Sequence, residues 1–245
     1  VKSVIVCPMA SQLPFPKNLV YPLVMRSAHA RMKIDSRHIA YKDLVHNDGA
    51  YQPVEIDTAK AVALLQYTGG TTGTPKGAML THQNLSSNAR QVAIIDPHRG
   101  ERDVMMGVLP FFHVFANACV LNRSVLNGGC IAMLPRFDSA QALKTLERVR
   151  ATAFPGVPTM YQALLDHPRA AKTDFSSLRV CISGGAPLPL PLKQRFEALS
   201  GARLVEGYGL TPEEAVLRTD MESGPARQRR RFRQTPTRIT VRWLF

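Results

Sequence analysis

Short apolar runs alternate with amphipathic segments between residues 61 and 206, and this alternation limits the fold more than any other feature. Strand-like runs lie at residues 62–67, 103–109, 130–134, 154–157 and 178–182. Segments with apolar residues at helical spacing lie between or after them, at residues 81–95, 113–126, 138–150, 159–165 and 192–199. Such alternation is typical of an α/β fold with a largely parallel sheet flanked by helices. We expect residues 62–67 to form a buried parallel strand of that sheet.

A glycine- and threonine-rich segment, Tyr-Thr-Gly-Gly-Thr-Thr-Gly-Thr-Pro-Lys-Gly, occupies residues 67–77 directly after the first of these strands. Its glycines permit close approaches that a Cβ would block, and its hydroxyls and lysine suit phosphate oxygens. A strand, such a turn and then a helix capped by Thr81 is typical of a nucleoside triphosphate site. A Walker-type loop is not expected, because Pro75 precedes Lys76 and Gly77 follows it. The alternative is a glycine-rich surface turn without a ligand.

Three blocks of sequence resemble the AMP-forming acyl-CoA synthetases of the adenylate-forming superfamily, in particular bacterial long-chain fatty-acid–CoA ligases. The blocks are LQYTGGTTGTPKGAMLTH at residues 65–82, LPFFHVFA at residues 109–116, and SGGAPL at residues 183–188 with EGYGLT at residues 206–211. The resemblance implies that residues 1–211 are part of the large N-terminal domain of the adenylate-forming fold. The family's C-terminal lid domain is expected to be absent.

The resemblance also implies a reaction, the ATP-dependent activation of a carboxylate by an acid–thiol ligase. The carboxylate attacks the α-phosphorus of ATP, pyrophosphate leaves, and the acyl-adenylate passes its acyl group to coenzyme A. This displacement depends on charge neutralisation and positioning rather than on a protein nucleophile. The implied substrate is a small carboxylate, most simply a fatty acid, and ATP, Mg²⁺ and coenzyme A are the implied cofactors and co-substrates.

The family's motifs assign candidate roles to matching residues. Lys76 would act as a point charge on the β- and γ-phosphates, Thr211 would hydrogen-bond the α-phosphate, and His113 would orient the substrate where the carboxylate meets ATP. Tyr208 would stack on the adenine ring. The expected nucleotide-binding residues are Thr68, Gly69, Gly70, Thr71, Thr72, Gly73, Thr74, Lys76, Gly184, Gly185, Ala186, Pro187, Glu206, Gly207, Tyr208, Gly209 and Thr211.

Two of these assignments leave alternatives open. His113 stands among Phe111, Phe112 and Phe115, and a histidine beside aromatic residues is equally consistent with a packed core position. The candidate magnesium ligands are Thr68 and Glu213, but Pro212 occupies the place where the family has its metal-binding glutamate. The sequence Thr-Pro-Glu-Glu at residues 211–214 also has the pattern of a helix start, with threonine as the N-cap.

The resemblance ends near residue 211, and residues 212–245 form a divergent, arginine-rich tail. Neither the family's ribose-binding aspartate nor its C-terminal lysine is found there. Our hypothesis is a shifted reading frame, or else a disordered tail. The chain is therefore expected to be an incomplete fragment with weak or no activity.

Seven arginines follow residue 226 with no acidic residue among them, and they account for about half of the net charge of +13, which leaves the rest of the chain mildly basic. Nucleic-acid binding is therefore not expected of the folded part. The alternative function is a non-catalytic protein that binds nucleic acid or membrane through the tail, although a solvated tail explains the arginines as well. No apolar run is long enough to indicate a transmembrane helix, so at most peripheral membrane association is expected. Four scattered cysteines predict reduced, buried thiols in a cytoplasmic protein.

Overall fold

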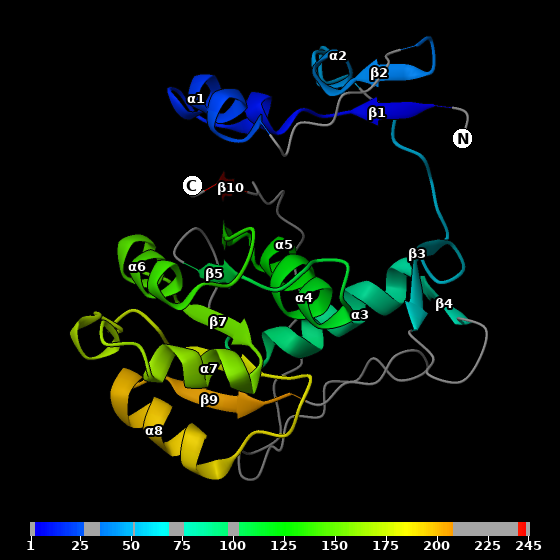
Figure 1. The fold of residues 1–245 in the computed structure, drawn as a ribbon. Helices are drawn as coiled ribbons and strands as arrows, with labels where there is room; N and C mark the ends of the chain where they lie inside the picture. The colour runs from blue at the N-terminus through cyan, green and yellow to red at the C-terminus, as the bar shows by residue number, and fades with distance from the viewer. Residues whose placement is uncertain are drawn as a thin grey trace. The chain divides into compact units, whose positions relative to one another are not determined.

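The computed structural model describes residues 3–26, 35–50, 52–68, 76–97, 103–207 and 240–243, which form two compact units. The first unit comprises Val1–Glu55 and Phe245. In it, strand β1 (Val4–Val6) pairs in parallel with β2 (His38–Ala40) (Figure 1). The 3-10 helix η1 (Met9–Gln12) and the helices α1 (Lys17–Val24) and α2 (Tyr41–Val45) complete its regular structure.

The second unit, Ile56–Leu244, is built around a six-stranded parallel sheet with the strand order β10-β6-β5-β7-β8-β9 (Figure 1). Its strands are β5 (Val104–Gly107), β6 (Cys130–Met133), β7 (Ala153–Gly156), β8 (Val180–Ser183), β9 (Arg203–Glu206) and β10 (Thr240–Trp243). Every adjacent pair runs parallel, so all carboxyl ends lie at one edge. The predicted α/β fold with a parallel sheet is confirmed.

Helices cover both faces of this sheet. One face carries α6 (Ser139–Val149), α7 (Pro158–Leu165) and α8 (Leu190–Ser200), and the other carries α3 (His82–Ala93) and a helical segment formed by α4 (Val114–Ala116), η3 (Asn117–Asn122) and α5 (Arg123–Asn127) (Figure 1). A short 3-10 helix, η4, spans Ala170–Lys172. The strands alternate between the two layers: Phe154 and Cys181 pack in the core with α6–α8, whereas Ala153 and Ile182 pack toward the other face. Burial on both faces explains why these strands are apolar throughout.

Local sequence signals set several helix boundaries. The Thr81 hydroxyl accepts the N–H of Asn84 at 3.2 Å, and the Asn84 side chain accepts the N–H of Thr81 at 2.9 Å, which forms a capping box. Asp138 Oδ1 likewise accepts the N–H of Gln141 at 2.8 Å at the start of α6. At the other ends, Gly128 and Gly201 adopt left-handed conformations that terminate α5 and α8. None of the helices described in the chain is long and apolar enough to span a bilayer.

The helix predicted over residues 113–126 contains a π-helical segment, Asn117–Asn122. The buried residues of this stretch recur at intervals of three and four and form one face of the helical segment. They are Ala116, Cys119, Val120, Arg123, Ser124 and Asn127. Asn122 Nδ2 donates to Asn117 Oδ1, five residues earlier, at 2.8 Å.

The prediction for residues 62–67 is wrong. Strand β3 (Val62–Thr68) pairs antiparallel with β4 (Lys76–Thr81) in a separate two-stranded sheet, and Val62, Leu65 and Tyr67 are 48, 54 and 64% exposed. The glycine-rich segment therefore joins two strands, and α3 follows the second of them. An apolar run is consistent with a strand inside the parallel sheet or with a strand of a separate antiparallel pair, and only the pairing partner distinguishes the two.

Two further expectations need correction. Cys7 is exposed, whereas Cys119, Cys130 and Cys181 are buried free thiols as predicted. Within the arginine-rich tail, Thr240–Trp243 forms β10 beside β6, where the sequence pattern predicted no strand. The rest of that tail lies outside the described residues.

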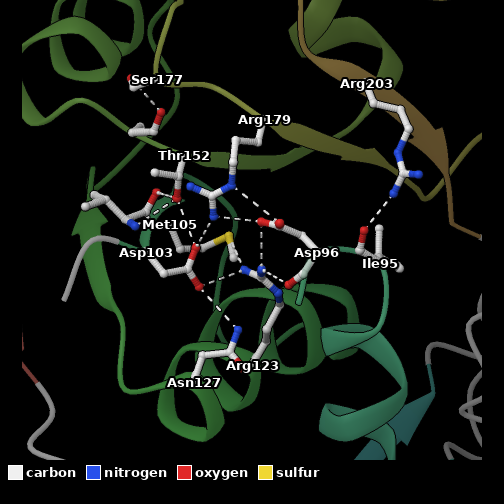
Figure 2. Close-up of polar contacts among 12 residues, drawn as sticks. Ile95, Asp96, Asp103, Met105, Arg123, Asn127, Thr152, Ser177, Arg179 and Arg203 are labelled. Atoms are coloured by element: carbon white, nitrogen blue, oxygen red, sulfur yellow. Dashed lines mark hydrogen bonds and ion pairs between the residues drawn. The ribbon is translucent and has the colours of Figure 1, made fainter. Parts of the chain in front are cut away.

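A buried network of charged side chains ties together the amino ends of the strands (Figure 2). Arg123 is 1% exposed; its guanidinium lies 3.2 Å from the Asp96 carboxylate and 3.4 Å from that of Asp103. Arg179 bridges the same two carboxylates at 2.9 and 3.1 Å. The Thr152 hydroxyl donates to Asp103 at 3.0 Å. Since Asp103, Thr152 and Arg179 precede β5, β7 and β8, the network closes the edge of the sheet opposite to the carboxyl ends.

Arg123→Met should lower the free energy of unfolding by about 3–5 kcal/mol, because it leaves two carboxylates buried beside a single remaining arginine. Urea denaturation followed by circular dichroism measures this. Arg148→Met is the control: Arg148 is exposed on α6, and its loss should change stability by about 0.5 kcal/mol or less. Equal stabilities for the two variants would contradict the structural role of the network.

In the native chain, only Cys7 among the four cysteines should react rapidly with a thiol reagent at pH 8. Burial raises the pKa of Cys119 to about 12 and raises that of Cys181 further still, so neither forms the reactive thiolate. With a reagent that releases a chromophore when it reacts with a thiol, absorbance should show one rapidly reacting thiol per chain without denaturant. In guanidinium chloride it should show four. A second fast thiol in the native chain would contradict the described burial.

Candidate nucleotide-binding site

The carboxyl edge of the parallel sheet brings together several segments that carry predicted site residues. Residues 108–113 follow β5, Gly184–Pro187 follows β8, and Gly207 follows β9. In open α/β sheets, ligands bind outside the carboxyl ends of the strands. The arrangement therefore places most of the described candidate residues where such a fold holds its ligand.

Backbone hydrogen bonds hold three strand ends together at this edge. Gly184 N–H donates to the carbonyl of Gly156 at 3.1 Å, and Gly207 N–H donates to that of Ser183 at 2.7 Å. In addition, the Glu206 carboxylate accepts the N–H of Leu188 at 3.1 Å. These bonds place the predicted residues Gly184, Glu206 and Gly207 in one contiguous structure.

The segment from Gly184 to Pro187 presents an open backbone surface. A Cβ on Gly184 would lie 3.0 Å from Phe115 Cζ, so a side chain there would press against the aromatic ring. Gly185 has a φ of +79°, in the left-handed region that favours glycine. Gly185, Ala186 and Pro187 are exposed. A planar ring could lie against this segment, as predicted for adenine.

His113 lies at the amino end of α4 and is exposed, not packed in the core. Its Nδ1 accepts the N–H of Phe115 at 3.2 Å. A neutral imidazole that accepts at Nδ1 carries its proton on Nε2, so Nε2–H is available as a donor. Phe115 in turn packs against Gly184, and this contact links the histidine to the glycine segment. Phe112 is exposed, whereas Phe111 and Phe115 are half-buried.

Other predicted residues are not placed in this site. Thr68 on β3 pairs with Lys76 on β4. Gly69, Gly70, Thr71, Thr72, Gly73 and Thr74, the side chains of Thr68 and Lys76, and Tyr208, Gly209, Thr211 and Glu213 lie outside the described residues. Within the described ranges, no group of three histidine, cysteine, aspartate or glutamate side chains is placed to hold a metal ion.

Two residues at this edge were not predicted to take part in the site. Ser183 ends β8 and is fully buried, and its Oγ has no hydrogen-bond partner among the described residues. Tyr161, on α7, lies beneath the ends of β7 and β8 and contacts their backbone. The sequence marked Ser183 only as the first residue of a motif and Tyr161 only as part of a helix.

The chain folds as an α/β domain, and its candidate site lies at the carboxyl edge of the parallel sheet. The AMP-binding enzyme family matches residues 11–234, and the chain belongs to this family. The match continues past residue 211, where the resemblance was expected to end.

Individual relatives match over much of the chain but over a smaller part of their own length. A long-chain-fatty-acid–CoA ligase of Bacillus subtilis is 40% identical over 227 residues, which cover 88% of this chain and 39% of that protein. A feruloyl-CoA synthase of an Amycolatopsis species is 42% identical over 159 residues, or 65% of this chain and 31% of that protein. The ATP-bound structure of MatB from Rhodopseudomonas palustris superimposes with a TM-score of 0.64 at 28% identity, covering 86% of this chain and 40% of that one.

Ser183→Ala should raise the free energy of unfolding by about 1 kcal/mol, because it removes a buried hydroxyl that makes no hydrogen bond to the described residues. Ser200→Ala is the matched control. The Ser200 hydroxyl is also buried, but it donates to the carbonyl of Phe196 at 2.7 Å, so its loss should destabilise by a similar amount. Thermal unfolding of the two variants measures the difference. A destabilised Ser183→Ala would show that Ser183 Oγ has a partner outside the described residues.

Proposed function

We propose that this chain is the nucleotide- and acyl-binding part of an AMP-forming acid–thiol ligase. In the proposed reaction, a carboxylate oxygen attacks the α-phosphorus of ATP and pyrophosphate leaves. The resulting acyl-adenylate transfers its acyl group to the thiol of coenzyme A, which releases AMP. The transfer to coenzyme A is proposed for the whole protein, because the chain spans only 39% of the length of the Bacillus relative.

The observation that carries this proposal is the joining of three strand ends at the carboxyl edge of the sheet. Gly184–Pro187 supplies an open backbone surface for adenine, and Gly207 fixes the adjacent strand end through its bond to Ser183. His113 is linked to the same segment through Phe115 and has an Nε2–H donor available. A neutral donor can orient a carboxylate or stabilise charge on an oxygen without being consumed in the reaction.

A long-chain fatty acid is the acyl substrate that we propose. Long-chain-fatty-acid–CoA ligases from Bacillus subtilis and Yersinia pestis align with 88 and 86% of the chain, whereas the feruloyl-CoA synthase aligns with 65%. The half-buried Phe111 and Phe115 offer apolar surface beside the histidine. An aromatic acid is the competing substrate, and it would meet the same two rings.

Magnesium is proposed only as the ion that accompanies ATP, where it would neutralise charge on the phosphates. The described side chains do not by themselves form a magnesium site. Mg²⁺ is commonly held by one or two carboxylates together with substrate phosphates. The predicted ligands Thr68 and Glu213 remain predictions.

Calorimetry should show that the 245-residue chain binds ATP in the presence of magnesium, and binds palmitoyl-sulfamoyl-adenosine more tightly than feruloyl-sulfamoyl-adenosine. These sulfamoyl compounds are stable analogues of acyl-adenylates. His113→Ala should weaken binding of the palmitoyl analogue about tenfold, because a hydrogen bond to a charged group contributes about 1.5 kcal/mol. Binding of AMP, which lacks the acyl group, should stay unchanged.

His167→Ala is the matched control for this experiment. His167 Nδ1 accepts the N–H of Arg169 at 3.1 Å, which is the same local geometry as in His113, but it follows α7 at the end remote from the carboxyl edge. This variant should bind both analogues like the unaltered chain. A folded chain that binds neither ATP nor the analogues would refute the proposed function. Preference for the feruloyl analogue would refute only the proposed substrate.

A further inference from the structure

Tyr161 places a hydroxyl group between two adjacent strands of the sheet. Its Oη lies 2.7 Å from the carbonyl oxygen of Phe154 on β7 and 3.0 Å from that of Ile182 on β8. A phenol has one proton to donate, so the hydroxyl serves one carbonyl at a time and lies within reach of both. The side chain thereby connects α7 to two neighbouring strands at one point.

This point lies directly beneath the candidate site. Phe154 precedes Gly156 by two residues, and Ile182 precedes Gly184 by two residues. Beyond these carbonyls, the N–H of the buried Gly184 donates to the carbonyl of Gly156, and the chain then enters the exposed residues 185–187. A Cβ on Gly156 would lie 3.4 Å from Cζ of the Tyr161 ring. The tyrosine therefore supports the last part of the β7–β8 pair before the binding segment begins.

The position of the Tyr161 ring is fixed by its surroundings. The Tyr161 ring is fully buried, and it packs edge to face against Phe154 and Phe196, with centroid distances of 5.5 and 5.0 Å. Burial raises the pKa of Tyr161 well above its ordinary value of 10, so the group remains a neutral donor at physiological pH. A rigid ring with one protonated hydroxyl is well suited to holding two backbone segments at a set spacing.

We propose that Tyr161 is a positioning residue for nucleotide binding, because its hydroxyl holds the ends of β7 and β8 in the arrangement that Gly184–Pro187 needs to receive adenine. This inference rests on the proposed function of the site. Tyr161 does not touch the nucleotide. It acts through the backbone of Phe154 and Ile182.

Tyr161→Phe tests the proposal, since it keeps the ring and both aromatic contacts and removes only the hydroxyl. We expect the variant to fold and its Kd for ATP with magnesium, measured by calorimetry, to rise about tenfold. Hydrogen exchange should accelerate at Gly184 and Leu188, whose amides donate at this edge, and should stay unchanged at Leu204, whose amide donates to Glu197.

Ser200→Ala separates positioning from general destabilisation. The Ser200 hydroxyl is also buried and also contacts two backbone groups, since it donates to Phe196 and accepts from Ala202, but it precedes β9 at the opposite edge of the sheet. This variant should lose as much thermal stability as Tyr161→Phe and should keep the Kd of the unaltered chain.

The possible outcomes are distinct. If the unaltered chain binds ATP and Tyr161→Phe binds it equally well, the positioning role is wrong while the proposed function stands. Equal weakening in both variants would also overturn the role, because destabilisation alone would then explain the loss. If Tyr161→Phe fails to fold, amide hydrogen exchange in the unaltered chain tests the proposal instead. The Gly184 amide must then be protected from exchange, and its exchange must slow further when ATP is added. An unprotected Gly184 amide overturns the proposal. Failure of the unaltered chain to bind ATP would refute the proposed function and this inference with it.

Discussion

The buried pairing of two arginines with two aspartates is the interaction on which the rest of this domain depends. Arg123 and Arg179 both contact Asp96 and Asp103, and Thr152 completes the set (Figure 2). Two positive and two negative charges balance within this network, in which Arg179 is half-buried and the other three side chains are buried. Removing any one partner would leave an uncompensated buried charge, which is far more costly than a surface pair. The network thereby fixes the amino ends of β5, β7 and β8 relative to α3 and α5.

Fixing one edge of the sheet leaves the other edge free to carry ligand-binding segments. The carboxyl ends are held mainly by backbone hydrogen bonds and by the Tyr161 hydroxyl, and they end in small residues. Gly184 accommodates a ring from the neighbouring helix, and Gly185 adopts a conformation that other residues rarely take. The amino edge of the sheet therefore contributes stability through the charge network, and the carboxyl edge carries the candidate binding segments.

Much of the fold could be predicted from the sequence because the relevant signals are local. Apolar runs, Thr81 and Asp138 as caps, and Gly128 and Gly201 as helix ends each depend on a few neighbouring residues. Residues 62–67 were assigned wrongly because an apolar run does not reveal its pairing partner, which here is the antiparallel strand β4. Strand β10 was not predicted because the apolar and polar residues at positions 240–243 show no pattern that distinguishes a strand from a loop.

The candidate site was predictable only where short motifs marked it. His113 and Gly184–Pro187 stand in such motifs, and the structure brings their segments together through Phe115. Tyr161 and the buried Ser183 hydroxyl could not be recognised, because their significance depends on contacts between residues distant in sequence. The charge network was hidden for the same reason: Asp96 and Arg179 are 83 positions apart.

The π-helical segment Asn117–Asn122 separates a histidine at one end of a helical rod from a buried arginine at the other. Each residue added to or removed from an α-helix rotates everything beyond it by about 100°. The wide π-helical turns therefore set the angle around the helix axis between His113 and Arg123. A single deletion inside them would rotate His113 relative to Arg123, so the length of this segment is constrained more tightly than its composition.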